Sequence, residues 1–138
     1  MRFAARVHNS EGEHRAEVSA GSHQASLSIA ARPSGFGSSV SGAELLMLAL
    51  ATCYCNDVYR EASRTGIQVT EVEVECAADF AAEGASASDV VFTARISANA
   101  DEELIRELAA RADSLAEIQN TVRAAVPVRL GAIEATRV

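Results

Sequence analysis

The chain has 138 residues, of which 49% are hydrophobic and 22% charged, and this composition predicts one folded domain over 1–138 and excludes a disordered chain. Acidic residues outnumber basic ones by 19 to 12, every basic residue is arginine, and the net charge of -7 makes nucleic acid and anionic membranes poor partners. The longest apolar stretch, 45–51, is much shorter than the roughly 20 residues that span a bilayer, and the N-terminus lacks a secretory signal's apolar run, so a cytoplasmic protein is expected.

The first thirty residues alternate polar and apolar side chains in short runs, which is typical of antiparallel strands. Three strands are predicted, over 3–8, 15–20 and 24–29, with turn-forming residues between them. The next segment, 32–39, combines proline, glycine and serine, and it is predicted to be irregular. Such a segment either lines a site or serves as a plain connector.

A long helix is predicted from Ser41 or Gly42 to about Arg64, because 43–51 consists almost wholly of strong helix formers. Ser41 and Glu44 have the spacing of a capping box, which sets a carboxylate at the positive end of the helix. The first half of this helix is apolar on every side. We therefore expect it to be covered by a sheet or by a second subunit, and this favours a dimer.

The second half of the sequence predicts a hairpin followed by two helices. Strands over 69–80 and 90–98 each alternate apolar and polar side chains, and Arg95 is expected to lie opposite a row of glutamates. Apolar residues at helical spacing predict helices over 101–112 and 114–125, the second ended by Pro127. A strand over 128–136 closes the order βββ-α-ββ-αα-β, which is an α+β fold.

Three cysteines, two of them one residue apart, do not form a disulfide framework. Cys53 and Cys55 point about 200° apart on a helix, so they cannot close a disulfide or share a metal ion. Cys55 and Cys76 are expected to be structural. Cys53 shares its helical stripe with Asp57 and Arg60, so a cation is available to stabilise a thiolate, although packing is an equally good reading.

The rest of the sequence contains no spacing that is typical of a metal-binding or catalytic motif. The histidines His8, His14 and His23 all precede the long helix and do not have the paired spacing of a zinc site. The sequence contains neither a phosphate loop nor a nucleophile elbow. We therefore expect no metal and no cofactor.

The segment 37–53, GSSVSGAELLMLALATC, resembles the hallmark segment of the OsmC and organic hydroperoxide resistance superfamily. The predicted order of elements is similar to that family over essentially the whole chain. The resemblance implies an intertwined homodimer in which antiparallel sheets wrap around a long buried central helix, with active sites at the dimer interface. It also implies reduction of organic hydroperoxides by two cysteines, assisted by an arginine and a glutamate.

Cys53 matches the first, peroxidatic cysteine of that family. The family's second cysteine, which precedes a proline, corresponds to Ala116-Glu117, so an intramolecular disulfide cannot form by the family's route. The family's proline-glutamate pair corresponds to Gly42-Ala43, with Glu44 one position later, and Arg32 is the counterpart of the assisting arginine. The segment after Cys53 resembles a divergent subgroup of OsmC-like proteins.

Two functions are compatible with these residues. The first is a stress-response protein in which Cys53, assisted by Arg32 and Glu44, reduces hydroperoxides or removes other electrophiles at the dimer interface and is reset by an external thiol. The second is a non-enzymatic dimer that binds a small apolar molecule, with Cys53 as packing. A zinc site at Cys53, Cys55 and a histidine is disfavoured by the helix geometry.

Overall fold

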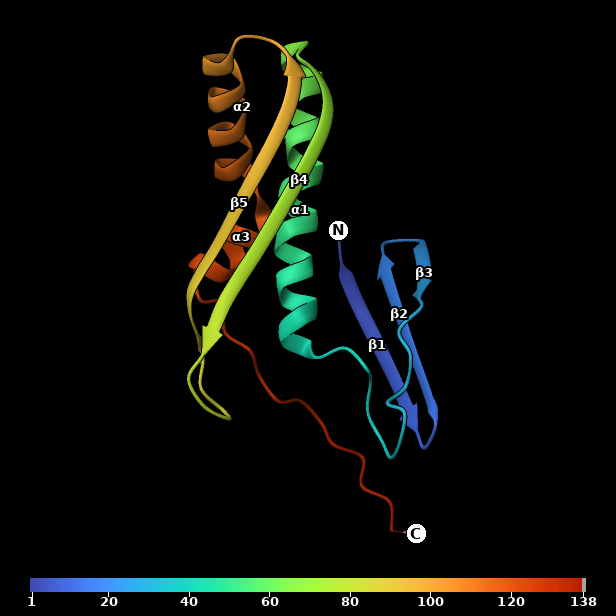
Figure 1. Ribbon diagram of the computed structural model, residues 1–138. Coiled ribbons are helices and arrows are strands. Elements are labelled where there is room, and N and C mark those ends of the chain that lie inside the picture. Colours follow the sequence, from blue (N-terminus) through green and yellow to red (C-terminus); the bar gives the residue numbers. More distant parts are fainter. Residues whose placement is uncertain (138) are drawn as a thin grey trace. The chain divides into compact units, whose positions relative to one another are not determined.

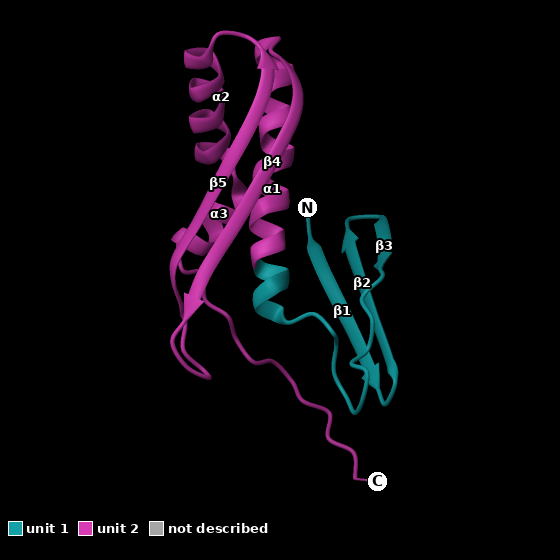
Figure 2. Ribbon diagram, in the orientation of Figure 1, with its two compact units in different colours: residues 1–46 teal, residues 47–138 magenta. Residues whose placement is uncertain are grey.

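The computed structural model describes residues 1–137 and separates the chain into two compact units, 1–46 and 47–138 (Figure 2). The longest helix, α1 (Gly42–Thr65), begins in the first unit and continues in the second. Among the described residues, no helix is both long enough and apolar enough to cross a membrane.

The first unit contains a three-stranded antiparallel sheet with the order β1-β2-β3 (Figure 1). Its strands are β1 (Phe3–Ser10), β2 (Glu13–Ala20) and β3 (His23–Leu27). The predicted meander is confirmed, although the last strand ends at Leu27 rather than at residue 29. The segment that follows holds only an isolated bridge between Ala31 and Ser38, so its predicted irregular character is also confirmed.

Helix α1 begins where the capping box predicts. The Ser41 backbone N–H donates to Glu44 Oε2 at 2.7 Å, and the Glu44 N–H donates to Ser41 Oγ at 3.2 Å. Hydrogen bonding of the carboxylate to the Ser41 backbone N–H and, after it, to the Ser41 side chain lowers the pKa of Glu44. At the other end, Gly66 has a φ of +74°, a left-handed conformation that glycine adopts readily and that stops the helix.

The second unit adds a hairpin and two helices to α1. The strands β4 (Gln68–Phe80) and β5 (Ala87–Asn99) pair antiparallel, followed by α2 (Glu102–Leu115) and α3 (Glu117–Arg123) (Figure 1). The expected cross-strand charge pair is confirmed, because Arg95 lies opposite Glu73 and its Nε is 3.5 Å from Glu73 Oε2. Each apolar strand face can therefore turn towards the helices while the charged face meets water.

The core of the second unit lies where α1, α2 and the hairpin meet. Tyr54 is central to it, because its ring centroid is 4.8 Å from that of Phe92 and its hydroxyl donates to the Ala109 carbonyl at 2.9 Å. The cluster consists of Tyr54, Val58, Ala62, Leu108 and Ala112, with Ile67, Val69, Val72, Val74, Phe92 and Ile96 packed against it.

Two features differ from the sequence prediction. Residues 128–137 contain no strand, so the predicted strand over 128–136 is wrong: these residues pair with neither described sheet, and a strand needs a partner for its backbone groups. Helix α1 is not covered on all sides by its own chain, since Leu48 is 61% exposed. Within the second unit, one stripe of this helix is buried.

Candidate functional site

One stripe of α1 carries every residue that the helix buries. Its members are Leu50, Tyr54, Asp57, Val58, Glu61 and Ala62, which recur at helical spacing. The stripe begins apolar and becomes charged towards its C-terminal end. Cys53 lies half-buried at the edge of the stripe, one turn before the first buried carboxylate.

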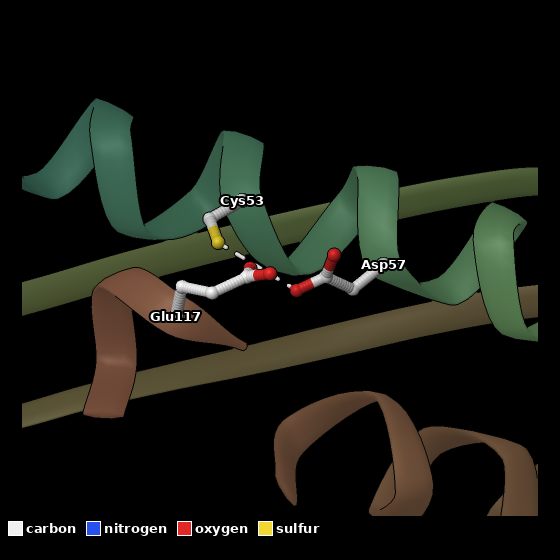
Figure 3. A group of neighbouring side chains, drawn as sticks. All are labelled: Cys53, Asp57 and Glu117. Carbon is white, nitrogen blue, oxygen red and sulfur yellow. Dashed lines mark hydrogen bonds between the residues drawn. The ribbon is translucent and has the colours of Figure 1, made fainter. Parts of the chain in front are cut away.

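Three reactive side chains meet at this edge (Figure 3). The sulfur of Cys53 and one carboxylate oxygen each of Asp57 and Glu117 lie within 4.8 Å of one another. The Cys53 thiol donates to Asp57 Oδ2 at 3.6 Å, and the spacing of four residues places both side chains on one face of α1. Glu117 approaches from the first residue of α3.

Arg60 is the cation of this site, but it reaches the carboxylates rather than the sulfur. Its Nη2 lies 2.9 Å from Asp57 Oδ1, and its Nη1 lies 3.6 Å from Glu117 Oε1. The sequence indicated Asp57 and Arg60 as neighbours of Cys53, because all three share a stripe. What spacing did not reveal is that the guanidinium pairs with the carboxylates.

Glu61 continues the charged network into the protein interior. Its side chain is fully buried. One carboxylate oxygen accepts a hydrogen bond from Arg64 Nη1, and the other accepts one from Arg111 Nε at 2.9 Å. Arg60 Nε lies 3.7 Å from the same carboxylate. Since Arg111 belongs to α2, the network ties α2 to the segment of α1 that carries the site.

Gln119 fixes the start of α3 against α1. Its side chain is 3% exposed, and its Nε2 donates to the Leu50 carbonyl at 2.8 Å. This contact holds Glu117 and the Ile118 backbone N–H beside Cys53, where the N–H lowers the pKa of the thiol. Sequence reasoning missed Gln119, since no pattern distinguishes a buried glutamine from a solvated one on a short amphipathic helix.

The surroundings of Cys53 favour the neutral thiol. Partial burial is the largest cause and raises the pKa of Cys53 above its ordinary value. The Ile118 N–H opposes this change, whereas the charges of Asp57 and Glu117 add to it. The expected stabilisation of a thiolate by a neighbouring cation is therefore not what the geometry provides.

Asp57 is a buried carboxyl with one strong partner. Burial raises its pKa above the ordinary value, Arg60 acts in the opposite direction, and the negative charge of Glu117 raises the pKa further. Its two oxygens have different neighbours, because Oδ1 faces Arg60 and Oδ2 faces the Cys53 sulfur. The arrangement is thus a chain from thiol to carboxylate to guanidinium.

The sulfur and the two carboxylates are also atoms of the kinds that bind divalent cations. Arg60, however, already lies against both carboxylates. A metal ion at this position would have to displace the guanidinium.

The other predicted site residues have partners of their own. In the first unit, Arg32 Nε donates to the Ser38 carbonyl at 3.4 Å, and Glu44 is engaged in the helix cap. An assisting role for either at Cys53 stays a prediction. Cys76 is half-buried, with its sulfur 3.5 Å from Met47 Sδ.

Cys55 was expected to be a core residue. Within the second unit it instead borders a shallow surface hollow of about 260 Å³, away from the buried stripe of α1. The hollow is lined by Leu48, Ala51, Thr52, Cys55, Asn56 and Val74. Helix geometry explains the difference, since position 55 points away from the stripe that α2 and α3 cover.

The fold and the site together define an α+β protein with a half-buried thiol at the junction of its longest helix and a short later helix. Residues 35–131 match the family described as OsmC-like protein, which is most of the chain. The chain belongs to this family, as the sequence resemblance implied. The comparison with curated proteins gives no match.

Solved structures share the fold at low sequence identity. An OsmC-like protein from Mycoplasma pneumoniae has a TM-score of 0.61 and 17% identity, with 88% of this chain and 86% of that chain covered. An OsmC-like protein of unknown function from Vibrio cholerae has a TM-score of 0.62 and 14% identity, over 88% and 93% of the two chains. An organic hydroperoxide resistance protein OsmC from Legionella pneumophila has a TM-score of 0.57 and 16% identity, over 89% and 90%.

Proposed function

We propose that this protein reduces organic hydroperoxides through Cys53 and is regenerated by an external thiol. The observation that carries the proposal is the position of Cys53, half-buried on α1 and hydrogen-bonded to Asp57 Oδ2 at 3.6 Å. The family membership and the hydroperoxide resistance protein among its structural neighbours support the substrate class. Arg32 and Glu44 remain candidates for assistance.

The reaction requires two half-steps. Sulfur attacks the terminal peroxide oxygen, the O–O bond breaks, and the thiol becomes a sulfenic acid while the peroxide leaves as an alcohol. A first external thiol then condenses with the sulfenic acid, releasing water, and a second thiol breaks the mixed disulfide and restores Cys53. An external reductant is needed because Ala116 and Glu117 stand where the family has its second cysteine.

The experiment is turnover of a neutral organic hydroperoxide with dithiothreitol as reductant. We expect catalytic consumption by the wild-type protein and complete loss in Cys53→Ser. Cys55→Ser and Cys76→Ser are matched controls and should retain activity, because neither sulfur is among the groups around Asp57. Peroxide consumption no faster than the dithiothreitol blank would exclude this function.

We further propose that the working unit is a cytoplasmic homodimer. Large apolar side chains remain exposed on a single copy, among them Leu48 at 61% and Leu130 at 86%. Apolar surface of this kind marks contacts with another molecule. The cytoplasm supplies the reduced thiols that the second half-step consumes.

A specific observation favours a second candidate function. Partial burial and, after it, the acidic neighbours of Cys53 disfavour the thiolate, and the hollow bordered by Cys55 is lined largely by apolar groups. Both are compatible with a non-enzymatic protein that binds a small apolar molecule. In that case a neutral fluorescent probe such as N-phenyl-1-naphthylamine should raise the melting temperature of wild type and Cys53→Ser equally.

A further inference from the structure

We propose that Asp57 is a catalytic residue that takes the proton of Cys53 during attack on the peroxide and returns it to the leaving alkoxide. This inference deepens the proposed function and rests on it. Its basis is the contact between Asp57 Oδ2 and the Cys53 sulfur at 3.6 Å. Asp57 is only 3% exposed.

The charges around the sulfur explain why a proton acceptor is needed. Loss of the thiol proton to solvent would leave a thiolate beside two carboxylates, whereas transfer to Asp57 leaves the net charge of the pair unchanged. In a partly desolvated site the second process costs less. The Cys53 thiol therefore loses its proton during its attack on the peroxide rather than beforehand.

The groups that surround the pair come from each element packed against it. Helix α1 supplies Arg60 and Glu61, α3 supplies Glu117 and the Ile118 N–H, and α2 reaches the network through Arg111. The hairpin contributes apolar side chains to the neighbouring core, namely Val72, Val74, Phe92 and Ile96. Asp57 is thus the buried carboxylate in direct contact with the sulfur.

Arg60 acts as a positioning residue. Its Nη2 binds Asp57 Oδ1 at 2.9 Å, which leaves Oδ2 turned towards the thiol. The same guanidinium holds Glu117 at 3.6 Å. Burial raises the pKa of Asp57, and the ion pair with Arg60 opposes that change and so favours the ionised form that accepts a proton.

The step consumes only the hydroperoxide and the Cys53 thiol, and needs no further oxidant or proton donor. The Cys53 S–H bond breaks and its proton moves to Asp57 Oδ2, the sulfur–oxygen bond forms, and the O–O bond breaks. The sulfur loses two electrons to the peroxide. The alkoxide then takes the proton from Asp57, which leaves an alcohol, a sulfenic acid and an ionised Asp57.

The test compares peroxide reduction with alkylation in Asp57→Asn. At pH 7 we expect the second-order rate constant for a neutral hydroperoxide to fall about 100-fold, the lower range for loss of a general base. The deficit should shrink as the pH rises through the thiol pKa, because the thiolate then forms without a base. Alkylation by iodoacetamide should become faster, because a negative charge beside the thiol has been removed.

Asp79→Asn is the matched control, since it removes a carboxylate from an exposed position of β4. It should change neither rate by more than about twofold, as is usual for a remote surface charge. Peroxide reduction by Asp57→Asn at the wild-type rate or faster at pH 7 would overturn the inference. An inert wild type would instead remove the proposed function itself.

A second measurement needs no variant and covers the case in which Asp57→Asn fails to fold. The peroxide step of the wild-type protein should be about twofold slower in heavy water at matched acidity, because a proton moves in the transition state. Alkylation above the thiol pKa serves as the internal reference and should show little isotope effect. An equally small effect on the peroxide step contradicts proton transfer to Asp57 during attack.

Discussion

Cys53 illustrates how strongly a few neighbours determine the chemistry of one thiol. The residue is half-buried, lies beside the backbone N–H of Ile118, and faces the carboxylates of Asp57 and Glu117. A reactive cysteine usually lies near cations or a helix N-terminus that lower its pKa. Here the α3 N-terminus is present, but partial burial of the thiol, together with the charges of Asp57 and Glu117, raises its pKa in spite of it.

The raised pKa of Cys53 predicts the pH dependence of its alkylation. Because the thiolate is the reacting species, the rate for iodoacetamide should rise with a midpoint above that of an unperturbed thiol. Glu117→Gln should shift this midpoint to lower pH, since it removes one of the negative charges beside the sulfur.

Glu103→Gln is the control for this measurement, because Glu103 is an exposed acid in the first turn of α2. It should leave the midpoint in place. The measurement follows Cys53 alone in a Cys55→Ser, Cys76→Ser background. A midpoint below the ordinary thiol value would contradict the acidic environment described for Cys53.

The helices of the second unit are joined by a charged network as well as by apolar packing. Glu61 lies on α1 and is fully buried, whereas its partner Arg111 belongs to α2. The carboxylate has lost its hydration, and arginine hydrogen bonds replace it. Removing such a carboxylate leaves its arginine partners without their counter-charge.

We therefore expect Glu61→Gln to lower the free energy of unfolding by about 3 kcal/mol, the lower end for a broken buried ion pair, because the arginines can turn to solvent. Arg106→Ala is the control, since its ion pair with Glu102 is exposed on both sides, and it should cost at most about 1 kcal/mol. Urea unfolding followed by circular dichroism measures both. Equal stability of Glu61→Gln and the wild-type protein would show that the network does not hold α1 and α2 together.

For the whole molecule, the relevant features are its net charge and its exposed apolar side chains. The chain carries a net charge of -7, which adds to the local repulsion that Glu117 exerts on anionic peroxides or thiols. The same chain exposes large apolar side chains on α1 and along 126–133. A second copy is the partner that we propose for this surface.

Sedimentation equilibrium should therefore show a species of twice the 14.5 kDa chain mass at micromolar concentration. Leu48→Asp should shift it towards monomer, because a charge in an apolar interface is poorly solvated. Ser63→Asp, an exposed position later in the same helix, should have no effect. A wild-type protein that sediments as a monomer would leave the exposed apolar surface without its proposed partner.

The sequence by itself determined the features that depend on neighbouring residues. The capping box at Ser41 and Glu44, the alternation along β4 and the helical stripe of α2 are encoded within a few residues, so periodicity and spacing were sufficient to predict them. The pairing of Arg95 with Glu73 followed from the same alternation once the two strands were placed side by side.

The tertiary structure decided which groups meet Cys53. Gln119 contacts Leu50 across 69 residues of sequence, and this contact brings Glu117 and the Ile118 N–H to the sulfur. It also showed that residues 128–137 do not form the predicted strand within their own chain. Side-chain spacing describes one element at a time, whereas the ionisation of a thiol and the pairing of a strand depend on what another element places beside them.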